Sequence, residues 1–355
     1  MKKNKKIIIV AGGTGGHIYP ALNIAYKLIK EGWEVRWLGT SSRMESKIIP
    51  KKNIYIYLIK FSRFKNKNIF SIIITIIKLL ISTYKSILIY KNYKPNLILT
   101  MGNYISGPSG LAAWLCNIPL IIHEQNSIPG ITNKILSIIA TVKMQAYPHT
   151  LNNAILVGNP ISKKIIKLSL YKRSILKIHK PIHVLITGGS QGANIINKIG
   201  IELAKILKNK ISILHQVGKG NFKKIFYEYK KNIINNLILK EYIKNIDQAY
   251  KWADIIICRS GAMTVSEITA IGLPAIFIPF QHKDKQQYFN AMYLKKIGAA
   301  KIYEQNNLNI NKIANTILSL NTKKIIYMAS KSYKLSIINS TELIYQELNK
   351  IKLIN

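Results

Sequence analysis

Residues 6–17 read Lys-Ile-Ile-Ile-Val-Ala-Gly-Gly-Thr-Gly-Gly-His. This is an apolar run of strand length that ends in four glycines, and residues 20–30 then have the apolar spacing of a helix. The same order returns at residues 183–193, which read His-Val-Leu-Ile-Thr-Gly-Gly-Ser-Gln-Gly-Ala and precede a helical pattern at 194–207. Because a strand, a glycine turn and a helix begin a Rossmann-like unit, the chain is predicted to start such a unit twice.

Short apolar runs follow both starts and alternate with longer helical patterns, as in a parallel sheet covered by helices. They lie at 35–38, 97–100 and 120–123 in the first half, and at 212–216, 255–258 and 275–279 in the second. The sequence therefore predicts an α/β chain of two Rossmann-like domains. Gly and Pro interrupt the pattern at 157–160, so we place the first domain at 1–160 and the second at 161–339. A last helix at 340–355 is expected to pack on the first domain.

The composition is typical of a globular chain. The 355 residues are 48% hydrophobic and 19% charged, and this length is enough for two cores. The formal net charge of +39 is almost entirely lysine. It has two interpretations, a compositional bias toward lysine or a partner that carries phosphate groups or anionic lipid headgroups. No nucleic-acid-binding module accompanies the charge, so no nucleic acid partner is expected.

Neither a disulfide nor a metal site is expected. The two cysteines, Cys116 and Cys258, are far apart and in no metal-ligand spacing. No Asp-x-Asp motif is present that could hold a divalent metal beside a diphosphate. We therefore expect no metal and no other cofactor, and helix N-termini would have to hold phosphate groups.

The most apolar segment, 69–89, is interrupted by Lys78 and Lys85, so a membrane span is not expected. The basic start of the chain runs directly into the first strand and leaves no room for a signal peptide, which indicates a cytosolic location. Polar residues within the segment form one stripe on an otherwise apolar helix, which predicts either binding at an anionic membrane surface or a buried helix. The stripe is Ser71, Thr75, Lys78, Ser82 and Lys85, flanked by Lys65, Lys67 and Lys91.

The first glycine loop, 12–16, is a candidate phosphate site. Glycines let backbone amides at a helix N-terminus face an anion such as a pyrophosphate, although a tight turn without a ligand has the same sequence. A nicotinamide cofactor is disfavoured, because Ile18 stands where the third glycine of that motif is needed. The strand that ends at Thr40 also lacks the acidic residue that would bind a ribose.

Two residues of the first half are candidate general bases. His17 directly follows the glycine loop, so its imidazole is expected beside a bound ligand, as a general base or as a ligand of a phosphate. Glu124 follows an apolar strand within His-Glu-Gln-Asn, residues 123–126, at the carboxyl end where open sheets form their sites. A structural histidine and a polar loop that caps the next helix are the alternative interpretations.

The second half offers a helix start rich in hydroxyl groups. Residues 258–267 read Cys-Arg-Ser-Gly-Ala-Met-Thr-Val-Ser-Glu, and free amides in the first helical turn favour anions. Glu267 could accept hydrogen bonds from a ribose diol or simply favour the helix dipole. Gln281, Gln286 and Gln287 supply amide groups that suit sugar hydroxyls.

Together these motifs resemble those of the MurG family, the peptidoglycan N-acetylglucosaminyltransferases of glycosyltransferase family 28, nearly from end to end. The matching segments are Gly-Gly-Thr-Gly-Gly-His at 12–17, His-Glu-Gln-Asn at 123–126, Gly-Gly-Ser-Gln-Gly-Ala at 188–193, the run at 258–267 and Pro-Phe-Gln-His-Lys-Asp at 279–284. The resemblance implies a GT-B fold, in which two parallel sheets face a central cleft. It implies an inverting, metal-independent transfer of N-acetylglucosamine from UDP-N-acetylglucosamine to the C4 hydroxyl of the undecaprenyl-pyrophosphoryl-N-acetylmuramoyl-pentapeptide lipid I, which gives lipid II. The enzyme would act as a peripheral protein at the cytoplasmic face of the inner membrane.

The resemblance also implies the residues that bind substrate. Either His17 or Glu124 would take the proton of the acceptor, and His17 is favoured. One position departs from the family pattern, because Ser162 stands where an arginine follows the Asn-Pro pair, and Lys163 or Lys164 could replace its charge. The implied contacts are Thr14, Gly15, Gly16 and Asn126 in the first domain, and Ser162, Ser190, Ile243, Ala262, Met263, Thr264, Val265, Ser266, Glu267, Gln286 and Gln287 in the second.

Other functions remain open from the sequence. A GT-B enzyme of another specificity could act on a soluble acceptor, or could epimerise a UDP-sugar without any acceptor. A basic nucleotide-binding or nucleic-acid-binding protein without catalysis would show strongly salt-dependent affinity.

Overall fold

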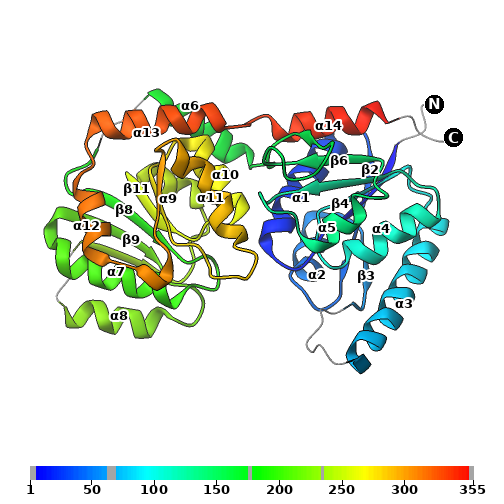
Figure 1. Ribbon diagram of the computed structural model, residues 1–355, viewed down its shortest axis with the longest axis horizontal. Coiled ribbons are helices and arrows are strands. Elements are labelled where there is room, and N and C mark those ends of the chain that lie inside the picture. The colour runs from blue at the N-terminus through cyan, green and yellow to red at the C-terminus, as the bar shows by residue number, and fades with distance from the viewer. Residues whose placement is uncertain (1–4, 62–68, 175–177, 233–235, 352–355) are drawn as a thin grey trace. The chain divides into compact units, whose positions relative to one another are not determined.

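The computed structural model describes residues 5–61, 69–174, 178–232 and 236–351. The chain divides into two compact units, unit 1 with residues 1–161 and 337–355, and unit 2 with residues 162–336 (Figure 1). The sequence placed the boundary between residues 160 and 161. Lys65 and Lys67 lie outside the described residues, and the side chain of Ser71 is not described.

Unit 1 contains a seven-stranded parallel sheet in the order β3-β2-β1-β4-β5-β6-β7. The inner strands are apolar on both faces and fully buried, as expected of a parallel sheet covered on both sides. The order reverses direction between β1 and β4, which is where open α/β sheets bind ligands. The strands are β1 (Lys6–Val10), β2 (Glu34–Thr40), β3 (Ile56–Ile59), β4 (Leu97–Thr100), β5 (Leu120–Glu124), β6 (Val142–Gln145) and β7 (Ile155–Leu156).

The helices of unit 1 cover both faces of this sheet (Figure 1). One face buries Ile7 and Ile9 against α1 and against Ile344 and Leu348 of α14, and the other buries Ile8 against α3 and α4. Lys27 of α1 also forms an ion pair with Glu342 of α14 at 2.8 Å. The helices are α1 (Gly15–Lys30), α2 (Glu45–Ile48), α3 (Ile69–Tyr93), α4 (Ser106–Leu115), α5 (Ile131–Leu136) and α14 (Ser340–Lys350), with a 3-10 turn at Pro50–Lys52.

Helix α1 begins five residues before the predicted start. The apolar spacing placed the start at Pro20, whereas Pro20 lies inside α1. The chain turns at Gly13, whose φ is +88°, and Thr14 is the extended N-cap residue. Gly15 and Gly16 therefore form the first helical turn, so the glycine loop and the helix N-terminus are one structure.

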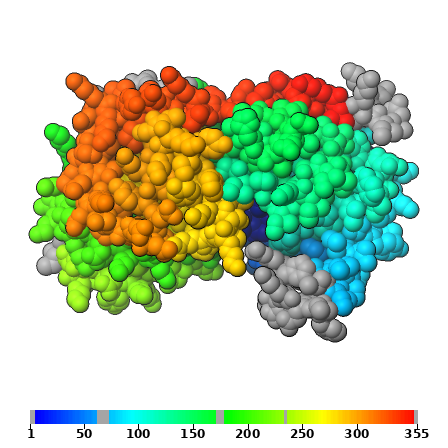
Figure 2. All heavy atoms as spheres, in the orientation of Figure 1, coloured from blue at the N-terminus to red at the C-terminus, as the bar shows by residue number. Residues whose placement is uncertain are grey.

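Helix α3 buries three hydroxyl side chains and exposes much of its apolar surface. Ser82, Thr83 and Ser86 are buried on the side that packs on α4, and Tyr90 donates a hydrogen bond to the carbonyl of Ser109. The part Ile73–Tyr93 is the one helix among the described residues long and apolar enough, by length and composition alone, to cross a membrane. Figure 2 shows α3, in light blue, at the surface of unit 1. The exposed apolar residues are Ile73, Ile74, Ile76, Ile77, Leu80, Ile81, Tyr84 and Leu88.

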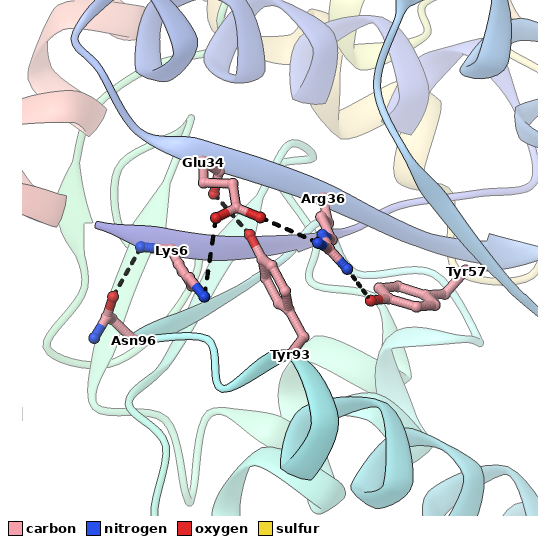
Figure 3. Close-up of polar contacts among 6 residues, drawn as sticks. All are labelled: Lys6, Glu34, Arg36, Tyr57, Tyr93 and Asn96. Carbon is pink, nitrogen blue, oxygen red and sulfur yellow. Dashed lines mark hydrogen bonds and ion pairs between the residues drawn. The ribbon is translucent and has the colours of Figure 1, made fainter. Parts of the chain in front are cut away.

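A polar cluster occupies the amino-terminal edge of the sheet of unit 1 (Figure 3). The hydroxyl of Tyr93 donates to the carbonyl of Glu34, and the guanidinium of Arg36 contacts the Glu34 carboxylate at 3.2 Å. The cluster joins the end of α3 to the starts of the central strands, at the opposite edge from the glycine loop. Its residues are Lys6, Glu34, Arg36, Tyr57, Tyr93 and Asn96.

Unit 2 repeats the architecture with a six-stranded parallel sheet in the order β10-β9-β8-β11-β12-β13. Its core packs buried residues of β8, β9 and β11 against α7 and α12. The strands are β8 (Ile182–Thr187), β9 (Ile211–Gln216), β10 (Leu237–Lys240), β11 (Ile255–Cys258), β12 (Ala275–Phe277) and β13 (Ala300–Ile302). The helices are α6 (Lys163–Ser174), α7 (Asn194–Leu207), α8 (Phe222–Lys231), α9 (Ile246–Trp252), α10 (Ala262–Ile271), α11 (Gln286–Lys296), α12 (Ile310–Leu318) and α13 (Thr322–Leu335), with 3-10 turns at Lys208–Lys210 and Gln305–Asn307.

Candidate active site

The glycine loop of unit 1 connects β1 to α1 at the carboxyl edge of the sheet. The carbonyl of Thr14 accepts hydrogen bonds from the amides of His17 and Ile18, so the first turn of α1 closes on Thr14. The amides of Gly15 and Gly16 belong to this first turn, where the helix itself supplies no acceptor. This geometry suits an anion at the N-terminus of α1.

Glu45 of α2 lies beneath the glycine loop with 0% exposure. Its carboxylate accepts hydrogen bonds from the amide of Gly13 at 3.0 Å, and from the amide and hydroxyl of Thr40 at 2.9 and 2.6 Å. A Cβ atom at Gly12 would lie 2.2 Å from Oε1 of Glu45, and one at Gly39 would lie 2.6 Å from its Cγ. The Gly13 amide therefore binds Glu45 and is not directed at a ligand. No local sequence pattern distinguishes Glu45 from the other carboxylates of the first half.

His17 is the first member of a chain of side chains that links α1 to β5. Its Nδ1 lies 3.0 Å from Oε1 of Gln125. The Gln125 Nε2 lies 3.0 Å both from Nδ1 and from the carbonyl oxygen of His123. His123 Nε2 in turn lies 2.9 Å from the carbonyl oxygen of Gly158. Burial lowers the pKa of His123 to about 4, so this imidazole is neutral at pH 7.

Glu124 is the other candidate base, and its side chain is 2% exposed. Oε1 accepts hydrogen bonds from the amide and the side chain of Asn126, and Oε2 accepts them from the amide of Gly130 and the side chain of Asn133. Both oxygens of the carboxylate are thus engaged, and they join the loop after β5 to α5. Asn126 is held by the same contacts.

The second glycine loop follows β8 in unit 2. Gly192 and Gly218 approach so closely that a Cβ atom at Gly192 would lie 2.2 Å from the carbonyl oxygen of Val217. Ser190 is exposed on this loop, and its carbonyl accepts a hydrogen bond from the amide of Lys219. The amide of Ile243, also predicted to contact substrate, donates to Oε1 of Gln216 at 2.8 Å.

Helix α10 begins directly after β11, with Gly261 as its extended N-cap residue. Ala262, Met263 and Thr264 form its first turn, and Val265 and Ser266 follow. Glu267 accepts a hydrogen bond from the hydroxyl of Tyr250 at 2.9 Å. Burial raises the pKa of Glu267 to about 7, and the Tyr250 hydrogen bond opposes part of that shift. Perturbed carboxyl groups of this kind are concentrated at functional sites.

Arg259 organises the segment that follows β12. Its guanidinium donates hydrogen bonds to the carbonyls of Ile278 and Pro279 and to Oε1 of Gln305. Gln287 accepts a hydrogen bond from the amide of Phe280, and the amide of Gln286 donates to Asp284. These contacts shape a cavity of about 420 Å³. It is lined by Pro279, Phe280, Gln281, His282, Lys283, Lys285, Tyr288, Glu304, Gln305 and Asn306.

Two family models match the chain in the same order as its two sheets. The glycosyltransferase family 28 N-terminal domain matches residues 7–145, and the C-terminal domain of that family matches residues 183–344. The chain belongs to glycosyltransferase family 28. The predictions of this family, of two Rossmann-like domains and of a glycosyltransferase are thereby confirmed.

Family 28 relatives cover essentially the whole chain. A protein of Buchnera aphidicola subsp. Schizaphis graminum is 50% identical and is named UDP-N-acetylglucosamine–N-acetylmuramyl-(pentapeptide) pyrophosphoryl-undecaprenol N-acetylglucosamine transferase. The alignment covers 98% of this chain and 99% of the relative. The crystal structure of Acinetobacter baumannii MurG has a TM-score of 0.84 at 32% identity, over 98% of this chain and all of that one. A UDP-GlcNAc 2-epimerase from Neisseria meningitidis, with a TM-score of 0.70 at 16% identity over 98% of this chain and all of that one, shares only the fold.

Ser162, which stands where the resemblance led us to expect an arginine, lies directly before α6. Its hydroxyl accepts a hydrogen bond from the amide of Ile165 at 3.4 Å, and its carbonyl accepts one from the amide of Ile166. This is the bonding of a serine at a helix N-cap. The hydroxyl of Ser162 therefore has a local structural role in this family 28 chain.

One group of side chains in the family 28 chain could hold a metal ion. One ligand atom from each of His179, His183 and Asp254 lies within 4.8 Å of the others. Asp254 already accepts hydrogen bonds from the amides of both histidine residues and contacts His179 Nδ1 at 2.8 Å. The two imidazoles are stacked with an interplanar angle of 13°, so their nitrogen lone pairs do not converge on one point. The cluster lies at the amino-terminal edge of the sheet of unit 2, away from the loops described above.

Proposed function

We propose that this chain transfers N-acetylglucosamine from UDP-N-acetylglucosamine to the C4 hydroxyl of the N-acetylmuramoyl sugar of lipid I, with inversion and without a metal, to give lipid II. The full-length relatives named for this transfer support it over an epimerase or a transferase with a soluble acceptor. The proposed transfer forms a bond between the acceptor O4 and C1 of the donor sugar. The C1–O bond to UDP breaks, and its electron pair stays on the diphosphate.

The observation that carries the mechanism is the contrast between the two candidate bases. The four hydrogen bonds that Glu124 accepts come from the loop that follows it and from Asn133 of α5. His17 lies at the first turn of α1, beside the glycine loop, and its described hydrogen bond to Gln125 uses Nδ1 alone. We therefore assign His17 as the group that receives the proton of the acceptor hydroxyl.

The donor is proposed to bind the carboxyl edge of unit 2. The N-terminus of α10 would stabilise the charge on the departing diphosphate, and Glu267 would accept hydrogen bonds from the ribose. Thr14, Gly15, Gly16 and Asn126 of unit 1 are proposed as further substrate contacts. Ser190, Ile243, the α10 residues and Gln286 with Gln287 complete the proposed donor site.

Donor affinity is expected to depend on the ionisation of Glu267. Because the pKa of Glu267 is raised to about 7, the ionised form that can accept hydrogen bonds from both ribose hydroxyls becomes populated only as the pH rises through 7. We expect UDP affinity, measured by calorimetry, to increase between pH 6 and pH 8. Glu267→Gln is expected to weaken UDP binding about tenfold at pH 8 and to remove this increase. Glu228→Gln, an exposed position of α8, is the matched control. A pH-independent affinity in the wild type would contradict the assignment.

The exposed apolar face of α3 is proposed to bind the cytoplasmic surface of the inner membrane. Leu80 is 59% exposed and Tyr84 is 61% exposed, although monomeric proteins rarely expose large contiguous apolar patches. Lys78, Lys85 and Lys91 are exposed on the same helix and would attract anionic headgroups. This supports the membrane-surface interpretation of the segment over the buried-helix interpretation. We propose no nucleic acid partner.

Charge on the apolar face of α3 is expected to weaken membrane binding. Leu80→Asp should lower partitioning onto vesicles that contain anionic phospholipid by about tenfold or more, because it removes an apolar contact and adds repulsion. Sedimentation with the vesicles measures the bound fraction. Ile206→Asp, at an exposed position of α7 in unit 2, should leave it unchanged. Equal partitioning of both variants would exclude α3 as the binding surface.

The decisive experiment is transfer of labelled N-acetylglucosamine from its UDP donor to a lipid I analogue in the presence of EDTA. Robust formation of the disaccharide product is the expected result, with an inverted anomeric centre by NMR. Conversion of UDP-N-acetylglucosamine without an acceptor would indicate an epimerase. Binding of the donor without transfer would indicate another acceptor.

A further inference from the structure

The hydrogen bonds around Gln125 determine which nitrogen of His17 carries a proton. The carbonyl oxygen of Gly158 can only accept a hydrogen bond, so the nearby Nε2 of His123 must carry a proton. Because His123 is neutral, its Nδ1 is then an unprotonated acceptor. Both this nitrogen and the carbonyl oxygen of His123 lie 3.0 Å from the same atom of Gln125.

These two acceptors fix the orientation of the Gln125 amide. Only the NH₂ end can donate to both of them, so the carbonyl end, Oε1, must face His17. The amide is 1% exposed, and Asn159 donates a hydrogen bond to the Gln125 backbone carbonyl at 3.0 Å, which holds the residue in place. An amide oxygen accepts hydrogen bonds and cannot donate them, so Nδ1 of neutral His17 carries its proton.

We propose that Gln125 is a positioning residue that holds His17 in its Nδ1-protonated tautomer and thereby leaves Nε2 as the atom that accepts the substrate proton. The inference rests on the proposed role of His17 as base. During transfer, the proton of the acceptor hydroxyl moves to Nε2, and the resulting imidazolium keeps its Nδ1–H···Oε1 hydrogen bond to Gln125. Without that acceptor, neutral His17 could carry its proton on Nε2 instead. Nε2 could then not accept the substrate proton.

The tautomer can be measured without any enzymatic assay. Nitrogen-15 NMR of the imidazole side chains distinguishes protonation at Nδ1 from protonation at Nε2, and the chain has seven histidines. The signals of His17 are those that disappear in His17→Ala. We expect the Nδ1-protonated form in the wild type at neutral pH and a shift toward the Nε2-protonated form in Gln125→Met, which keeps the side-chain length but removes the acceptor. A wild-type His17 protonated at Nε2 would overturn the proposal, even if the variant did not fold.

A double-mutant cycle tests the catalytic consequence. Gln125→Met is expected to lower kcat about 10- to 100-fold, and adding it to His17→Ala should cause no further loss, because both changes remove the same function. An additional loss in the double variant would mean that Gln125 acts through the general structure of the loop, which would overturn the proposal. Absence of transfer in the wild type would instead refute the proposed function, while the NMR result would still decide the tautomer.

Discussion

Replacing His17 by alanine is expected to lower kcat for transfer by about 10²- to 10⁴-fold, the usual contribution of a general base. The imidazole lies beside the glycine loop, and its described hydrogen bond, to Gln125, uses Nδ1. Alanine removes the proton acceptor and leaves the backbone contacts of His17 to Thr14 possible. Steady-state kinetics with saturating donor and acceptor measure the effect.

Binding measurements separate this effect from a loss of structure. UDP affinity of His17→Ala should stay within about twofold of the wild type, because the donor nucleotide is proposed to bind unit 2. His149→Ala is the control for removal of a histidine from unit 1, since His149 is not among the proposed substrate contacts. A rate within about threefold of the wild type would reject His17 as base and redirect attention to Glu124.

Replacing Glu45 by alanine is expected to lower the free energy of unfolding by about 3–5 kcal/mol. The change leaves three donors without their acceptor, namely the amide of Gly13 and the amide and hydroxyl of Thr40. Because Gly13 belongs to the glycine loop, transfer activity should fall as well. Urea unfolding followed by far-UV circular dichroism measures the stability.

Glu34→Ala is the matched control for the loss of one carboxylate from unit 1. Glu34 lies at the opposite edge of the sheet, its side chain is 38% exposed, and its partners are Lys6 and Arg36 (Figure 3). Ion pairs at such exposed positions contribute little, so we expect a loss below about 1 kcal/mol and unchanged activity. Equal stability losses in the two variants would show that the hydrogen bonds of Glu45 have no special importance.

The central strands and the two glycine loops could be predicted from the sequence because their signals are local. The strands at residues 97–100 and 255–258 and the helix at 194–207 have the predicted bounds. A short apolar run that can be buried on both faces and is followed by glycines is compatible with few elements other than a central strand of a parallel sheet.

Features that depend on tertiary contacts could not be predicted in the same way. The contact of Glu45 with Gly13 joins residues 32 positions apart, and that of His17 with Gln125 joins residues 108 positions apart. The sequence pattern of α3 predicted one polar stripe, whereas in the structure Ser82 of that stripe is buried and Lys78 and Lys85 are exposed. The pattern could not indicate which side packs on α4. Helical periodicity identifies two faces, and only the neighbouring element determines which one is buried.

The steric relation of Glu45 to Gly12 and Gly39 has a consequence for how this chain can evolve. While the glutamate is present, a methyl group at either glycine would overlap its side chain. Alanine at position 12 or 39 would be tolerated only after position 45 had mutated to a shorter residue, and that first step would carry the stability loss described above. The three positions should therefore change together. In a lineage with a shorter residue at position 45, the closest remaining neighbours of the new methyl groups would be Asn103 at 3.2 Å from position 12 and Ile56 at 3.4 Å from position 39.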